Sequence, residues 1–149
     1  MDERSLRSAI HVFIEKLKMD KCFDEREEAV MDMIVAAAKQ IEEKIGGKPD
    51  VMVIINAGPE LCYQRISGRD QPDDKSIQLG ELRCIDLLHK RMAREAIEEG
   101  ITVVYLDEVE QDQKVLQLRE LSAYLESIAA GEEDVGKPVF ITILKPKVN

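Results

Sequence analysis

Two arginines four residues apart are the part of this sequence best suited to chemistry. Arg65 and Arg69 lie at the end of a predicted helix, just before the polar segment 70–75. At this spacing two guanidinium groups share one helix face, so they could hold phosphate oxygens and stabilise charge in a phosphoryl transfer. Both residues also fit a solvated helix end, where cations complement the helix dipole, and spacing alone favours that simpler interpretation.

The elements that would position these arginines alternate between strands and helices. Runs rich in β-branched residues, typical of strands buried on both faces, cover 51–55, 101–106 and 139–144. Helices are expected from Pro59 to near Gly68, over about 78–99 and over about 113–130. Strands separated by helices form right-handed βαβ units. The sequence therefore predicts an α/β fold with a short parallel sheet flanked by helices, in which 51–55 and 101–106 are neighbours.

Two more helices are predicted before the first strand. Apolar residues recur at helical spacing over about 5–18. Asp24 followed by Glu27 has the pattern of a capping box, and the apolar face that begins there continues to Ile45. The pair Gly46-Gly47 then ends the helix.

Composition excludes several classes of protein. The chain has 149 residues, which favours one domain, and its net charge is −9, which argues against nucleic-acid binding. No apolar stretch approaches the roughly 20 residues of a spanning helix, so no membrane association is expected. Three unclustered cysteines and two isolated histidines argue against a metal site and favour an intracellular, cytoplasmic location, with a virus particle or infected cell as a further setting.

Two groups of motifs, in the same order and at similar spacing, resemble the deoxynucleoside kinases of the thymidine/deoxycytidine type. The first is Glu3-Arg4-Ser5-Leu6, followed by Ala9 and Phe13. The second begins with the strand at 51–55 and continues through Gly58-Pro59-Glu60, the two arginines and Asp73-Asp74. The resemblance covers about residues 3–107 and implies a P-loop-kinase-like fold.

The resemblance implies a role for each matching residue. Glu3 matches a carboxylate that helps to hold Mg²⁺, and Arg4 matches an arginine at the 5′-hydroxyl and the transferred phosphate. Ala9 would leave room for a thymine-like base and Phe13 would stack on it. Arg65 and Arg69 match phosphate-binding lid arginines, and Asp74 matches a carboxylate near the sugar 3′-hydroxyl. The plain alternatives are a core position for Phe13, a solvated turn for Asp74 and a frayed terminus for Glu3 and Arg4.

The chain also departs from the family pattern. In the family, a first strand, a glycine-rich phosphate loop and a catalytic carboxylate precede the Glu-Arg-Ser segment, and we expect this chain to lack all three. Gln71 replaces a third lid arginine. The spacing of Gly131, Gly136 and Lys137 imitates a phosphate loop, but Pro138 replaces the Mg²⁺-binding hydroxyl and the segment follows a helix instead of a strand.

We therefore expect one deoxynucleoside-kinase-like domain over 1–149, in which 131–149 is an extension carrying an extra strand. The chain alone would be non-catalytic, would need no cofactor, and would act as a structural or protein-binding component. Self-association or a protein partner would cover the exposed edge of its sheet. The alternative is one part of an active kinase that uses ATP and Mg²⁺ to phosphorylate a thymidine-like deoxynucleoside, completed by an upstream segment or another chain. A third hypothesis is a regulator that binds nucleosides or nucleotides in the remaining half-pocket.

Overall fold

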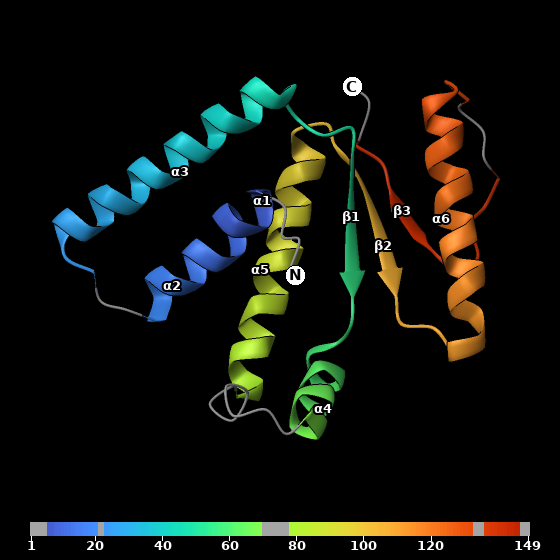
Figure 1. Ribbon diagram of the computed structural model, residues 1–149, viewed down its shortest axis with the longest axis horizontal. Helices are drawn as coiled ribbons and strands as arrows, with labels where there is room; N and C mark the ends of the chain where they lie inside the picture. Colours follow the sequence, from blue (N-terminus) through green and yellow to red (C-terminus); the bar gives the residue numbers. More distant parts are fainter. Residues whose placement is uncertain (1–5, 21–22, 70–77, 133–135, 147–149) are drawn as a thin grey trace. The chain divides into compact units, whose positions relative to one another are not determined.

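The computed structural model describes residues 6–20, 23–69, 78–132 and 136–146 (Figure 1). The chain divides into two compact units that interleave along the sequence. Unit 1 contains Met1–Pro49 and Pro59–Ala96, and unit 2 contains Asp50–Gly58 and Ile97–Asn149. Each unit is described by itself below.

Unit 1 is helical, and its first helix changes type along its length. It begins as α1 (Leu6–Ser8), widens into the π-helix η1 (Ala9–Ile14) and continues as α2 (Glu15–Asp20). The other helices are α3 (Glu25–Ile45), α4 (Pro59–Arg69) and α5 (Leu79–Glu98). The helix predicted over 5–18 is present, but periodicity did not predict its π segment. The buried apolar residues of unit 1 are aliphatic: Ile10, Val12, Leu88, Met92, Ala93 and Ala96.

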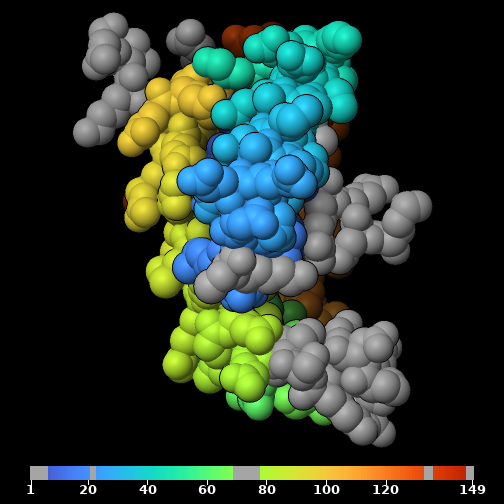
Figure 2. Space-filling view, turned by 90° about the vertical axis from the view of Figure 1, so that its left-hand side faces the viewer, coloured from blue at the N-terminus to red at the C-terminus, as the bar shows by residue number. Residues whose placement is uncertain are grey.

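Helix α3 begins and ends where the sequence predicts. The Asp24 side chain accepts a hydrogen bond of 2.8 Å from the Glu27 backbone N–H, which satisfies one of the donors exposed at a helix start. Gly46 closes the helix with a positive φ of 132°, a conformation that glycine adopts easily. Figure 2 shows α3 in blue to cyan on the face toward the viewer. Five large apolar side chains of this helix are exposed: Val30, Met33, Ile34, Ile41 and Ile45.

Unit 2 holds a three-stranded sheet in the described residues. Its strands are β1 (Val51–Asn56), β2 (Thr102–Asp107) and β3 (Thr142–Leu144), in the order β1-β2-β3. β1 and β2 are parallel and pair from Val51↔Thr102 to Asn56↔Asp107, which confirms the predicted neighbours. The α/β class is thereby confirmed. β3 runs antiparallel to β2, so the sheet is mixed and not wholly parallel as predicted.

The third strand is shorter than the predicted 139–144. The carboxylate of Glu120 accepts hydrogen bonds from the backbone N–H groups of Val139, Phe140 and Ile141 at 2.8–3.0 Å. These groups are therefore held by a helix and not by a neighbouring strand. Only the last three residues of the apolar run pair with β2.

One face of this sheet packs against helix α6 (Lys114–Ala129), which follows a short 3-10 turn, η3 (Gln111–Gln113). Val104 and Leu106 of β2 form a core with Tyr124 of α6 and with Ile141. Because side chains alternate along a strand, Val103 and Tyr105 point to the opposite face.

The candidate phosphate loop near Gly131 follows α6 and precedes β3, the reverse of the order that a phosphate loop needs.

Among residues 6–20, 23–69, 78–132 and 136–146, no helix has both the length and the apolar composition needed to cross a membrane.

Candidate functional site

Both arginines matched to the phosphate lid lie in helix α4. Arg65 lies in the second half of α4 and its side chain is exposed. Arg69 is the last residue of α4, and its side chain lies outside the described part of the chain. Glu3, Arg4 and Asp74 also lie outside the described residues. The common face predicted for the two arginines therefore stays a prediction.

The start of the lid helix is tied to α5 by an ion pair. The Arg83 guanidinium donates to one Glu60 carboxylate oxygen through Nε at 3.3 Å and Nη2 at 3.2 Å. The Glu60 backbone N–H and then the Arg83 side chain lower the pKa of the Glu60 carboxyl. Both side chains are more than half exposed, so the pair aligns α4 with α5 while adding little stability.

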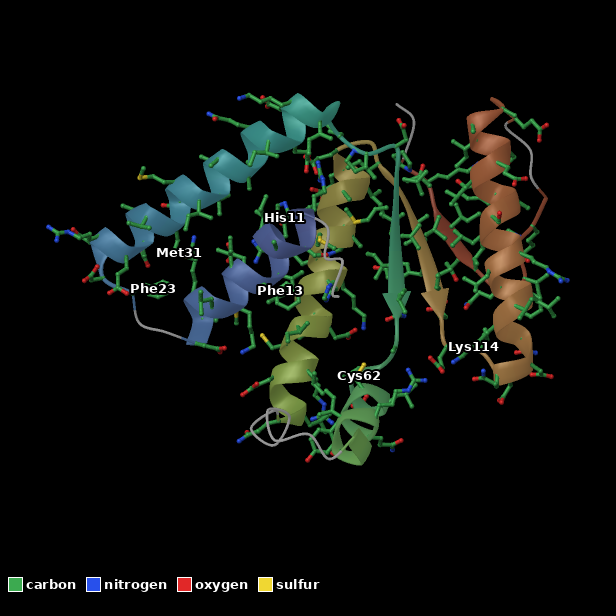
Figure 3. All side chains as sticks on the ribbon, viewed as in Figure 1. His11, Phe13, Phe23, Met31, Cys62 and Lys114 are labelled. Atoms are coloured by element: carbon green, nitrogen blue, oxygen red, sulfur yellow. The ribbon has the colours of Figure 1, made fainter. Side chains whose placement is uncertain are left out.

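The two residues matched to base recognition lie on the π segment η1, at its first and fifth positions. Ala9 and Phe13 are both half-buried. The Phe13 ring meets the His89 ring of α5 edge-on, with 6.2 Å between centroids and an interplanar angle of 82° (Figure 3). Phe13 thus packs within unit 1 and remains half-buried, so its match to base recognition stays a prediction.

Three side chains of the first helix contact α5 at successive points. Besides Phe13, the Ser8 hydroxyl lies 3.9 Å from the Met92 sulfur, and His11 Nδ1 lies 3.3 Å from a Glu95 oxygen. Short π segments are frequent at functional sites because the wider turn changes which side chains share a face. Here the π segment supplies both residues matched to base recognition.

The histidines were not predicted to belong to this region, and the structure places both there. His89 Nδ1 lies 3.0 Å from the Ile85 carbonyl oxygen, which can only accept, so Nδ1 is the donor in this hydrogen bond. His11 pairs with Glu95, 84 positions along the chain. No local sequence signal could have indicated contacts between residues so far apart.

A second polar cluster lies at the carboxyl ends of β1 and β2, where the antiparallel β3 begins. Open α/β sheets commonly bind ligands at the carboxyl ends of their parallel strands. The Asn56 amide donates to Asp107 Oδ1 at 2.8 Å, and the Thr142 hydroxyl donates to Asp107 Oδ2 at 3.0 Å. Gln117 of α6 donates to the Asp107 and Phe140 carbonyl oxygens at 2.7 and 3.0 Å. Because both carboxylate oxygens are occupied, Asp107 ties the ends of three strands together.

The next feature is the placement of the side chains that could bind a metal ion. No group of three or more His, Cys, Asp or Glu side chains converges there as a metal site would require. Glu3, matched to a magnesium-holding carboxylate, lies outside that part of the chain.

Comparisons with known proteins identify the family of the chain. The family model described as "Deoxynucleoside kinase" matches residues 1–126. Thymidine kinase 2, mitochondrial, from Homo sapiens is 31% identical over 90 residues, and so is its counterpart from Macaca fascicularis. Each match covers 59% of this chain and 32% of the relative, so the chain matches about a third of the length of these relatives. The family match covers most of the sequence, and the chain therefore belongs to the deoxynucleoside kinase family.

Proposed function

We propose that this 149-residue chain does not phosphorylate deoxynucleosides by itself and acts as a structural or protein-binding component. The observation that carries the proposal is the position of β1 at the edge of the sheet, with Val53 and Ile55 exposed. An apolar edge strand of this kind favours association with another polypeptide.

The chemistry of the family supports the same conclusion. Phosphoryl transfer depends on positioning the phosphates and on neutralising their charge. Arg65, Arg69 and Arg4 would supply cations, and Glu3 a carboxylate for Mg²⁺. In contrast, the sequence offers no glycine-rich loop between a strand and a helix, apart from the misplaced spacing around Gly131. Each missing electrostatic anchor costs roughly 10²- to 10³-fold in rate.

The test is a phosphorylation assay of the purified chain with ATP, Mg²⁺ and each of the four deoxynucleosides. We expect no turnover above background. Turnover that disappears in the Arg4→Ala variant would overturn the proposal, because it would show that the chain contains a working site. Calorimetry with thymidine and its nucleotides on the same sample tests whether Ala9, Phe13 and Asp74 still form a half-pocket that binds nucleosides.

A second function is favoured by one observation. Ala9 and Phe13 are half-accessible and share one short helical segment, as a base-binding surface would require. The relatives are named as thymidine kinases. In this alternative, another segment or chain supplies the phosphate loop and the base, and the assembled protein transfers a phosphoryl group from ATP to the 5′-hydroxyl of a thymidine-like deoxynucleoside. Turnover that appears only after such a segment is added would favour this alternative.

A further inference from the structure

The segment that leads into β3 is fastened to helix α6 through its backbone. The Glu120 carboxylate accepts hydrogen bonds from the N–H groups of Val139, Phe140 and Ile141 at 2.8–3.0 Å. The Gln117 side chain, which is buried, donates to the Phe140 carbonyl oxygen at 3.0 Å. The Ile141 side chain adds to the core under α6. Helix α6 thus sets the position of the chain just before β3.

The first residue of β3 continues this attachment to the ends of the other two strands. The Thr142 hydroxyl donates to Asp107 Oδ2 at 3.0 Å, and the Asn56 amide donates to Asp107 Oδ1 at 2.8 Å. Asp107 is the last residue of β2, and Asn56 is the last residue of β1. One carboxylate thus links β3 to β1, although these two strands lie on opposite sides of β2.

The two hydrogen bonds of the Asp107 carboxylate differ in exposure. The bond from Thr142 is exposed, whereas the bond from Asn56 is partly buried. The terminal torsion of an aspartate side chain has a broad energy minimum, so a carboxylate bound at one oxygen can turn more freely than one bound at both. Loss of the Thr142 donor would therefore let the Asp107 carboxylate turn and weaken its bond with Asn56.

The end of β1 is also the last part of the sheet before the lid helix. Asn56 is joined through Ala57 and Gly58 to α4, which begins at Pro59 and carries the two arginines matched to the phosphate lid. The family match ends at residue 126, so the segment that contacts Asp107 from β3 lies outside it. The fixation of β1 by this segment therefore does not follow from the family match.

We infer that residues 139–144 form a strap through which helix α6 controls the end of β1. While Glu120 holds the strap, Thr142 holds Asp107 and Asp107 holds Asn56. When the Glu120 contact is lost, the strap loosens, the Asp107 carboxylate turns, and the residues that lead into the lid helix become mobile. The strap needs neither a partner nor turnover, so its test is independent of the proposed protein-binding function.

The experiment follows the far end of this series of contacts by NMR. The full 149-residue chain is compared with Glu120→Gln, with Thr142→Val and with the double variant. The side-chain amide signals of Asn56 report its hydrogen bond with Asp107. Relaxation dispersion at the backbone amides of Ala57 and Gly58 detects microsecond-to-millisecond motion in the residues before the lid helix.

We expect both single variants to move the Asn56 signals toward those of a solvated asparagine. Each should raise the population of the mobile state about 10-fold, as expected when a hydrogen bond to a charged group is lost or weakened. The double variant should match Thr142→Val, because Glu120 then has no contact through which to act on Asp107. Thr142→Ser keeps the hydroxyl and should restore the original signals, and Glu126→Gln, on the same helix, should leave them unchanged. If Glu120→Gln lowers stability too far, Thr142→Val, at an exposed position, carries the test with Thr142→Ser.

Three results would contradict the strap. If Thr142→Val leaves the Asn56 signals unchanged, the hydroxyl does not hold Asp107. If the effects of the two substitutions add in the double variant, Glu120 acts on Asn56 by another route. If the Asn56 signals move while Ala57 and Gly58 stay rigid, the effect ends at the sheet and does not reach the lid helix. Failure of the proposed function is seen separately, as phosphorylation by the chain alone.

Discussion

Replacing Glu120 with glutamine should weaken the attachment of residues 139–141 to α6. The carboxylate accepts from three successive backbone N–H groups at 2.8–3.0 Å, two of them partly buried. Hydrogen bonds to a charged group stabilise a fold by about 1.5–3 kcal/mol each, against about 1 kcal/mol for neutral pairs. Because a glutamine oxygen can still accept, we expect Glu120→Gln to lower the free energy of unfolding by roughly 2–3 kcal/mol.

The same contacts make stability depend on pH. Partial burial of the Glu120 carboxyl raises its pKa, but the amides of Val139, Phe140 and Ile141 together lower it below its ordinary value. The stabilisation is therefore complete above the pKa of the unfolded carboxyl, and it is lost as the pH falls through the lower pKa of the folded state. Glu120→Gln should remove this part of the acid sensitivity.

Urea unfolding followed by circular dichroism measures both effects, at neutral pH and across the acid range. Glu126→Gln is the matched control, because Glu126 is on the same helix and is exposed. The reasoning is refuted if the two variants unfold at the same urea concentration at neutral pH. It is also refuted if Glu120→Gln keeps the acid dependence of the unchanged protein.

Other predictions concern the remaining buried contacts and one helix cap. Glu42→Ala should cost about 1.5–3 kcal/mol of unfolding free energy, because it removes the charged hydrogen bond of 2.7 Å that the largely buried Arg7 guanidinium donates to Glu42; a loss in urea unfolding no larger than that of Glu43→Ala would contradict this. Gln117→Leu should cost about 1–3 kcal/mol, since two carbonyl oxygens lose their donor, and a thermal midpoint equal to that of the unchanged protein would exclude it. Asp24→Ala should cost about 1 kcal/mol and reduce the helix signal in circular dichroism, whereas an unchanged signal and stability would mean that the cap adds nothing.

Local signals predicted the parts of the fold that depend on local physics. Asp24 and Gly46 define the ends of α3 because capping and positive φ are properties of single residues. Pro59 likewise begins α4. The continuous β-branched runs identified β1 and β2 as parallel neighbours. The burial on both faces expected for 51–55 was wrong, because Met52 and Ile54 are buried on one face of β1 whereas Val53 and Ile55 are exposed on the other.

What the sequence could not predict depends on contacts between distant residues. The run 139–144 has the composition of a strand, but Glu120 binds the amides of its first half. The π segment at Ala9–Ile14 has no local marker, and it accompanies contacts with α5 such as that of Phe13 with His89. In the candidate site, the family resemblance identified Phe13, whereas only the folded chain shows the neighbouring histidines.

The interleaving of the two units has a consequence for synthesis on the ribosome. Val51 emerges well before Thr102, its register partner 51 positions later, while Pro59–Ala96 is still being made. During that interval β1 lacks β2, its pairing partner, so its inner edge is exposed to whatever binds nascent chains. Slowing translation within 59–96 would lengthen this exposure and increase aggregation, whereas slowing it after residue 107 would not, because β2 has then been synthesised.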